Sequence, residues 1–164
     1  MQFATDGDAR VIVGIDVTNS GNDHGKMAPM YEQLHARYGQ RPLEYQVDGG
    51  FAKKEDITTL EQHGTKVFAP LHGAERMRNK GRDPYAPQPD DSAEMRVFRQ
   101  RMATEEAKEK YKRRPSIAEF PNADCRNRGL TQFRVRGLIK VKAVALWHAL
   151  AFNFLRILDL TASS

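Results

Sequence analysis

Residues 43–50 have the sequence LEYQVDGG, and this stretch decides the fold class. Leu43 to Val47 predicts a buried strand, and Asp48 follows where that strand ends. Two glycines come next, which let the backbone turn sharply and leave the carboxylate uncrowded. Catalytic and ligand-binding groups collect at strand ends in sheets layered by helices. Asp48 is therefore a candidate functional residue, and an aspartate that only starts a turn is the alternative.

Strands and helices alternate around this stretch. Upstream, a short strand, the pair Asp6-Gly7 and a β-branched run predict a hairpin with a two-residue turn. The predicted elements are strands at 2–5 and 10–17, a helix at 26–37, a strand at 43–47, a helix at 54–62 and a strand at 66–71. This order predicts an α/β fold whose sheet is layered by helices, and the hairpin makes that sheet mixed.

The second half of the chain is helical apart from one irregular stretch. Residues 72–91 hold three prolines among glycines and charges, which predicts a loop or an insertion. Helices are predicted at 92–111, 116–128 and 137–160. The length of 164 residues suits one domain with a core of its own.

The last predicted helix contains the longest apolar run, Ala143 to Leu158. Three polar residues interrupt the run: His148, Asn153 and Arg156. Such a run is too short and too polar for a membrane span, so we expect a buried core helix and no membrane partner. Trp147 and Phe152 are expected in the core.

The charge balance favours an anionic partner. Lys and Arg number 26 against 21 Asp and Glu, which gives a formal charge of +5. Nucleic acid is the commonest such partner, and a merely basic surface is the alternative. The single cysteine, Cys125, excludes a disulfide within the chain and is expected to pack rather than react. No basic segment followed by an apolar run opens the sequence, so we expect a reducing, cytoplasmic location.

A second acid stands out in residues 111–119, which have the sequence YKRRPSIAE. Glu119 is the one acid there among several cations. Ser116 and Glu119 also have the S-x-x-E spacing of a helix capping box, which places Pro121 in the second turn at the cost of a helical hydrogen bond. If the helix instead starts near Phe120, Pro121 fits its first turn and Glu119 lies just outside.

Cations gather again from Arg126 to Lys142. Phe133 and Val135 alternate with arginines there, which predicts a strand-like or loop element that contacts the phosphate backbone without reading sequence. A solvated basic face is the alternative, and the lysines at 108–112 are spaced to pair with glutamates at 105–109 on one helix. The arginines taken as DNA contacts here are Arg126, Arg128, Arg134 and Arg136.

Several of these motifs, in order, resemble those of DDE-type insertion-sequence transposases. That family carries a tyrosine, an arginine three residues on, the catalytic glutamate, and a basic residue seven beyond it. The segment VDGGFAKKEDI (47–57) resembles the part that holds the family's second catalytic aspartate, which maps to Asp48. Residues 16–30 and 127–157 resemble the segment after the early hairpin and the terminal helix region. The residues that match the glutamate motif are Tyr111, Arg114, Glu119 and Arg126.

The resemblance implies a ribonuclease-H-like mixed sheet flanked by helices, and cleavage and transfer of DNA strands at transposon ends. In such folds three carboxylates hold two Mg²⁺ ions, or Mn²⁺ in their place, which stabilise the phosphoryl transition state. The resemblance assigns Asp48 and Glu119 as catalytic and metal-binding residues. It assigns phosphate contacts to Tyr111, Arg114 and Arg126.

The family's first catalytic aspartate has no counterpart in the same context here. Asp6 and Asp8 are expected to serve the hairpin turn, and Asp16 lies on the second arm. The family's first strand would lie between the hairpin and the strand of Asp48, so either the remaining strands pair directly or the chain is poorly stable alone. We therefore expect residues 1–164 to form a single, truncated catalytic domain that is inactive alone.

Two alternatives stay open. In the first, the chain is a non-catalytic DNA-binding remnant that pairs with a second copy or with a full-length transposase. In the second, it is an unrelated basic α/β domain. Salt-sensitive DNA binding without cleavage would favour the remnant.

Overall fold

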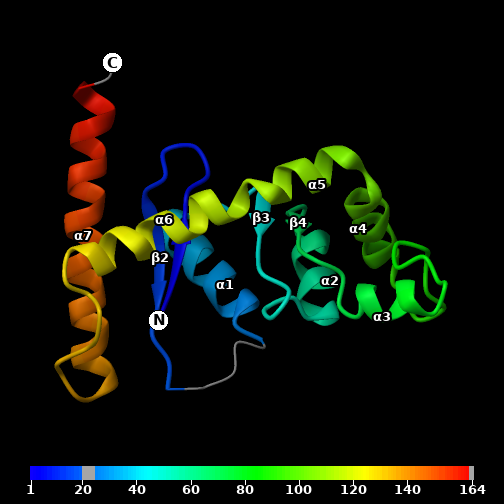
Figure 1. Cartoon of the computed structure of the whole chain (residues 1–164), viewed down its shortest axis with the longest axis horizontal. Coiled ribbons are helices and arrows are strands. Elements are labelled where there is room, and N and C mark those ends of the chain that lie inside the picture. The colour runs from blue at the N-terminus through cyan, green and yellow to red at the C-terminus, as the bar shows by residue number, and fades with distance from the viewer. Residues whose placement is uncertain (20–24, 163–164) are drawn as a thin grey trace. The chain divides into compact units, whose positions relative to one another are not determined.

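The structure, a computed structural model, describes residues 1–19 and 25–162. The chain divides into two compact units, whose elements are labelled in Figure 1. Residues 1–21 and 114–164 form one of them, called the hairpin unit below, and residues 22–113 form the other, called the βαβ unit. Small sheets and several helices confirm the predicted α/β class.

The βαβ unit is built on two parallel strands joined by a helix. β3 (Glu44–Gln46) pairs with β4 (Lys66–Phe68), and α2 (Lys54–Gln62) makes the crossover between them. A parallel pair needs such a crossover because both strands run in the same direction. Four further helices complete the unit: α1 (Met27–Tyr38), α3 (Ala74–Asn79), α4 (Ala93–Ala103) and α5 (Glu105–Lys112).

The core of the βαβ unit lies between these strands and helices. The Tyr31 hydroxyl shares a buried hydrogen bond of 2.8 Å with the Thr65 hydroxyl, which also donates to the carbonyl of Pro42 at 2.7 Å. Buried polar groups of this kind cost little once they are satisfied. The largest apolar side chains with almost no exposed surface are Met27, Tyr31, Leu60, Val67 and Phe98.

Two charged side chains close the outer edge of β4. Lys66 donates its N–H on the β3 side of the strand, and Phe68 accepts there through its carbonyl. Val67 faces the other way, where its N–H donates to Glu61 at 2.8 Å and its carbonyl accepts from Arg101 at 3.1 Å. Arg101 and Glu61 also pair with each other, Nη2 to Oε2 at 2.7 Å. This edge of the sheet therefore has no free backbone group at Val67.

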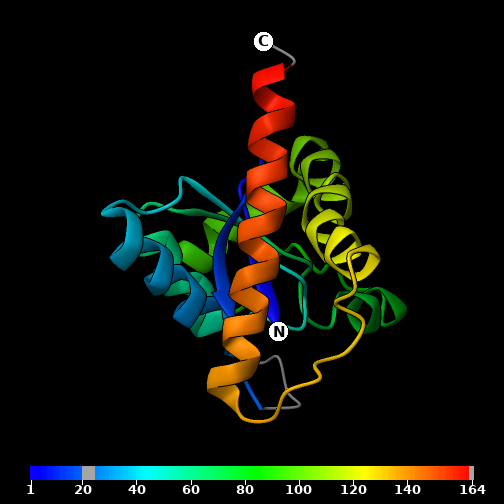
Figure 2. The same cartoon turned by 90° about the vertical axis from the view of Figure 1, so that its left-hand side faces the viewer.

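The hairpin unit consists of an antiparallel pair of strands and two helices. β1 (Gln2–Thr5) pairs with β2 (Ile12–Asp16), and α7 (Leu138–Ala162) runs along the hairpin (Figure 2). α6 (Arg114–Asn127) packs against β1 and α7. The core residues of the unit are Ile12, Ile15, Ala145, Ala149 and Phe152.

An asparagine from α7 closes the outer edge of β2. Asn153 accepts the Ile12 N–H through Oδ1 at 2.7 Å and donates from Nδ2 to the Ile12 carbonyl at 2.7 Å. The amide of Asn153 thus replaces a neighbouring strand at Ile12, because it offers one acceptor and one donor at the right spacing.

The predicted two-residue turn at Asp6-Gly7 is wrong. The Asp6 carboxylate accepts the N–H groups of Asp8 at 3.1 Å and Ala9 at 2.7 Å, which holds a longer loop. Arg10 ends that loop in the left-handed region, at a φ of 59°. The expectation that Asp6 serves the turn is confirmed, since its side chain organises the loop.

The prediction that the last helix is a buried core helix is also wrong. α7 has the expected bounds to within two residues, but only one of its faces packs on the hairpin. Phe152 is buried as predicted, whereas Trp147 is 70% exposed. By length and composition α7 is apolar enough to cross a membrane, a test that core helices of soluble proteins also pass.

Other elements differ from the predictions in smaller ways. The described strands form two two-stranded sheets, one antiparallel and one parallel, instead of one mixed sheet. The helix predicted at 92–111 is divided at Thr104, whose hydroxyl accepts the Ala107 N–H at 3.2 Å and caps α5. The stretch at 72–91 is a series of turns with the short helix α3. A single domain over 1–164 stays a prediction.

Candidate functional site

Asp48 lies two residues after the end of β3, at the strand end where the sequence predicted it. The Val47 N–H donates to the Phe68 carbonyl at 3.0 Å, so the ladder continues up to the residue before Asp48. The Asp48 carboxylate accepts the Gly49 N–H at 2.7 Å, and its carbonyl accepts the Phe51 N–H at 3.0 Å. Both interpretations of this residue therefore hold, because Asp48 ends a parallel strand and also starts a turn.

Tyr111 lies near this strand end within the same unit. Its hydroxyl donates to the carbonyl of Val47, the residue before Asp48, at 3.3 Å. Since Tyr111 stands near the end of α5, this bond fixes that helix to the end of β3. A role for Tyr111 in phosphate contact stays a prediction, and its structural role at the strand end is an observation that the sequence did not reveal.

Glu119 is an exposed residue of α6 in the hairpin unit. Neither predicted start of this helix is right, because α6 begins at Arg114, two residues before Ser116. Ser116 is therefore inside the helix and does not cap it. Pro121 also lies inside the helix, where it has no N–H to donate to the helical hydrogen bonds. Its side chain is buried, as is that of Cys125 in the next turn.

The two candidate carboxylates belong to different units, Asp48 to the βαβ unit and Glu119 to the hairpin unit. Their convergence on a shared cation stays a prediction. In residues 1–19 and 25–162, no group of three or more His, Cys, Asp or Glu side chains is arranged to hold a metal ion. Within those residues neither unit by itself gathers the three carboxylates that the resemblance implies.

The acid-free stretch with the most cations lies in residues 126–142, called the basic segment below. It contains six arginines and lysines and no acid. It begins at the end of α6, crosses the loop to α7 and enters that helix. Arg128 is paired with Asp124 of α6 at 2.7 Å. The six cations, all exposed, are Arg126, Arg128, Arg134, Arg136, Lys140 and Lys142.

The loop of the basic segment presents its arginines outward. Phe133 packs against the core of the hairpin unit, and Val135 is half-buried, whereas Arg134 and Arg136 are exposed. The predicted alternation is thus confirmed in a loop rather than in a strand. Such a loop presents two guanidinium groups on an anchored backbone, which suits contact with successive phosphates.

The cations of α5 are arranged differently. Lys108 pairs with Glu105 at 2.7 Å, and Lys112 pairs with Glu109, both one helical turn apart. Lys110 reaches Glu44 in β3 at 2.6 Å. The alternative interpretation, a solvated face of paired charges, therefore holds for α5, and the role of the basic segment in binding nucleic acid stays a prediction.

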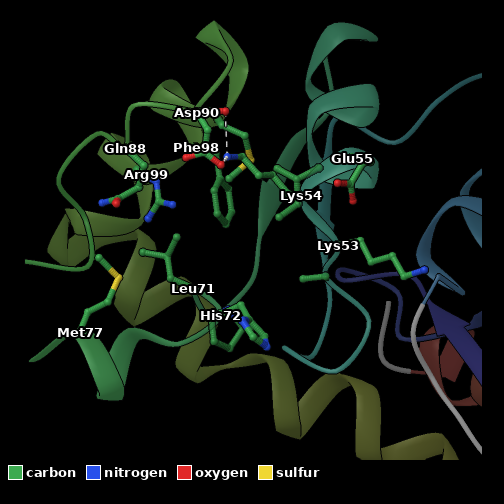
Figure 3. Close-up of a pocket in the computed structure, with 14 residues that line it drawn as sticks. Lys53, Lys54, Glu55, Leu71, His72, Met77, Gln88, Asp90, Phe98 and Arg99 are labelled. Carbon is green, nitrogen blue, oxygen red and sulfur yellow. Dashed lines mark hydrogen bonds and ion pairs between the residues drawn. The ribbon is translucent and has the colours of Figure 1, made fainter. Parts of the chain in front are cut away.

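The βαβ unit also has a cavity of about 480 Å³ with an apolar floor and a charged rim, shown in Figure 3. Lys54 on its rim is directed at Asp90, to which it donates at 2.7 Å. Lys54 also reaches Asp91 at 3.0 Å, and Arg99 donates to Asp91 at 2.6 Å. The rim charges named here are satisfied by one another, so the cavity offers a weaker anion site than its composition suggests.

Asp91 does not line the cavity itself, but it binds Lys54 and Arg99, which do, and its pKa is strongly shifted. Burial would raise its pKa, but hydrogen bonds from Arg99, from the Gln88 N–H and from Lys54 outweigh that effect and lower the pKa to about 2. Sequence reasoning missed this cluster because Asp91 falls in the stretch taken as a loop or insertion. The only local signal was Ser92, whose hydroxyl accepts the Met95 N–H and caps α4.

These observations define a basic α/β protein with an exposed, acid-free cationic segment. Comparison with protein families gives a match to the transposase DDE domain over residues 75–158, which is 84 of the 164 residues. The chain therefore belongs to the transposase DDE domain family. The match includes Glu119 and the whole basic segment but not Asp48. No curated protein and no solved structure matched the chain.

Proposed function

We propose that this chain acts in DNA transposition, binding DNA through the basic segment and contributing Asp48 and Glu119 to a DDE site. Its family membership supports a transposition-related role. The observation that carries DNA binding is the exposed, acid-free run of six cations that begins on α6, the helix of Glu119.

The chemistry of the basic segment suits the phosphate backbone. Guanidinium groups match phosphate oxygens in a bidentate geometry, and exposed cations release condensed counterions when they bind. Six such contacts would make the affinity fall roughly 10³-fold between 50 and 200 mM salt. Arg114 and Tyr111 are further candidate contacts from the same resemblance.

A ribonuclease-H-like sheet is our proposal for the finer fold. In such a sheet a further strand pairs with both the hairpin and the strand of Asp48. Asn153 closes the outer edge of β2 and the Glu61–Arg101 pair closes that of β4. These closures would leave β1 and β3 to pair with the further strand, which supports the proposal.

We also propose that the 164-residue chain does not cleave DNA by itself. A DDE site needs three carboxylates to hold its divalent cations, which supply the charge that stabilises the phosphoryl transition state. The chain offers Asp48 and Glu119 and, within the described residues, no third acid gathered with either. DNA binding without strand cleavage is the expected behaviour, and the third carboxylate would come from another segment.

DNA binding is tested by gel shift on a short duplex at several salt concentrations. We expect the double substitution Arg134→Ala and Arg136→Ala to weaken binding more than 10-fold and to reduce the salt slope by about 2. The matched control is the double substitution Lys108→Ala and Lys112→Ala, which removes two cations that are paired with glutamates and should change the affinity less than about 2-fold. Failure of the wild-type chain to bind at low salt would contradict the proposal.

Catalysis is tested by nicking of supercoiled plasmid with Mg²⁺ or Mn²⁺. We expect no nicking by the wild-type chain and unchanged DNA binding by the Asp48→Ala and Glu119→Ala variants. Robust turnover that Asp48→Ala abolishes would show that the chain is a complete nuclease, and the proposed incompleteness would be wrong.

A further inference from the structure

A second run of cations lies on the βαβ unit, at α3 and the turn that follows it. Residues 76–82 have the sequence RMRNKGR, which holds four cations and no acid in seven positions. This run is shorter than the basic segment but denser in charge, and it belongs to the other compact unit. The four side chains, all exposed, are called the α3 cations below: Arg76, Arg78, Lys80 and Arg82.

The α3 cations have no acid to neutralise them. In the part of the chain that the structure describes, no Asp or Glu side chain forms an ion pair with any of the four. The neighbouring acids are placed otherwise: Glu75 stands in the first turn of α3, and Asp83 accepts the Tyr85 N–H at 2.9 Å. Arg78 donates to a neutral group, the Tyr85 hydroxyl, at 3.5 Å. The arrangement is therefore unlike that of α5, whose lysines are paired with glutamates.

The end of a helix favours cations, but this effect does not account for the whole run. The carbonyl groups of the last turn carry partial negative charge, which attracts a basic residue there. Each further cation is repelled by those already present, since like charges one helical turn apart destabilise each other. Four cations in seven residues therefore indicate an anionic partner that offsets this repulsion.

A helix C-cap fixes the backbone that carries these charges. The Arg82 N–H donates to the Met77 carbonyl at 2.9 Å, and the Gly81 N–H donates to the Arg78 carbonyl at 2.8 Å, which together form a Schellman motif. Gly81 has the left-handed conformation that the motif requires, at a φ of 67°. The Met77 side chain lines the cavity of the βαβ unit (Figure 3), so α3 is anchored by an apolar contact while its cations are exposed.

The segment that leads into α3 lies at the same edge of the sheet as Asp48. β3 and β4 are parallel, so their carboxyl ends meet at one edge. Asp48 lies just beyond β3, and Pro70 lies just beyond β4. The two segments touch there, because a Cβ built on Gly49 would lie 3.6 Å from the Pro70 Cγ. A ligand on the α3 cations is thus held by the segment that leaves this edge, where such sheets bind their ligands.

We propose that the α3 cations form a second phosphate-binding surface, through which the βαβ unit holds duplex DNA separately from the basic segment. Three of the four are arginines, whose guanidinium groups match phosphate oxygens in a bidentate geometry. The choice of DNA as the polyanion rests on the proposed function. The surface adds to that function a DNA contact in the unit of Asp48.

Fluorescence anisotropy of a labelled duplex measures the affinity of the 164-residue chain at several salt concentrations. We expect the double substitution Arg76→Gln and Lys80→Gln to weaken binding about 10-fold and to reduce the salt slope by about 2, because each phosphate contact releases about one counterion. The matched control, Lys108→Gln with Lys112→Gln, removes the same charge from the same unit. Its two lysines are paired with glutamates, so the affinity should change less than about 2-fold.

Protection from acetylation tests the surface without any substitution. An N-hydroxysuccinimide ester of acetic acid modifies exposed lysine amines, and mass spectrometry reads the modification at each position. We expect a saturating duplex to slow the acetylation of Lys80 severalfold and to leave that of Lys112, which is 69% exposed, unchanged.

Three outcomes would overturn the proposal, and they are distinguishable. Suppose that the Arg76→Gln and Lys80→Gln variant behaves like its control and Lys80 stays reactive, while the basic-segment variant of the preceding section loses affinity. The basic segment then binds DNA alone, and the proposed function stands without this surface. If the wild-type chain does not bind the duplex at low salt, the proposed function fails as well. If polyglutamate protects Lys80 as well as DNA does at equal charge concentration, the surface takes acidic protein segments instead of DNA.

Discussion

Three donors converge on the carboxylate of Asp91, whose side chain has no exposed surface. Its pKa in the folded chain is about 2, below the ordinary value of 3.8. A group whose pKa is lowered on folding stabilises the folded state above the ordinary value and loses that contribution as pH falls. Asp91 therefore contributes about 2 kcal/mol to the free energy of unfolding at neutral pH, and this contribution is lost as pH falls from about 4 to about 2.

We expect the Asp91→Asn variant to have a lower free energy of unfolding at pH 7, because the buried Arg99 loses its charge partner. Its stability should also fall less than that of the wild type between pH 4 and pH 2. Thermal unfolding followed by circular dichroism measures both. Asp90→Asn is the matched control, since the Asp90 side chain is 79% exposed and should contribute little. An equal loss of acid sensitivity in both variants would contradict the assignment.

At the scale of elements, both sheets have an outer strand whose backbone is closed by helix side chains. Asn153 serves Ile12 in β2, and Glu61 with Arg101 serves Val67 in β4. A two-stranded sheet is marginal in water, so these closures are part of what allows such short strands to persist.

The Asn153→Leu variant tests the closure of β2. The substitution keeps the size of the side chain and removes both of its bonds to Ile12, so we expect a loss of about 2 kcal/mol in the free energy of unfolding. Urea unfolding measures the loss, and faster amide hydrogen exchange at Ile12 localises it. Asn122→Leu is the matched control, because Asn122 bonds only to the Ala118 carbonyl of its own helix. Equal effects of the two substitutions would show that edge closure is unimportant.

The sequence predicted helices well and their burial poorly. α2 has its predicted bounds and α1 is displaced by one residue, because periodicity and glycine stop signals are local. The interior face of α7 was not predictable in the same way, since the helix is apolar on nearly every side and the pattern does not show which face is covered. The edge closures were missed because Asn153 acts on a residue 141 positions away.

At the scale of the whole chain, the candidate site was predicted only in part. The position of Asp48 at a strand end followed from the apolar run and the glycines after it, and the structure confirms it. Glu119 and Pro121 lie inside α6, as one of the two predicted helix starts had it, but α6 begins at Arg114, so the predicted cap at Ser116 is wrong. The DNA contacts in the basic segment came from charge and from resemblance, and they stay predictions until binding is measured.

The chain has two separate hydrophobic cores, one in each unit, and this separation has a thermodynamic consequence. Leu60 is fully buried in the core of the βαβ unit, and Phe152 is buried in that of the hairpin unit. Truncation of either side chain to alanine should cost about 3 kcal/mol or more, because it removes apolar burial and leaves a cavity. If the cores are energetically independent, each loss stays within its own unit.

Hydrogen exchange read by mass spectrometry measures this independence peptide by peptide. We expect Leu60→Ala to speed exchange about 10²-fold in 25–113 and Phe152→Ala to do so in 1–19 and 114–162, with little effect elsewhere, since 1.4 kcal/mol corresponds to a tenfold change in an opening equilibrium. Val97→Ala, at an exposed position, should change neither region. Acceleration across the whole chain by either core variant would mean that the two cores unfold as one cooperative body, and the division into units would then have no energetic counterpart.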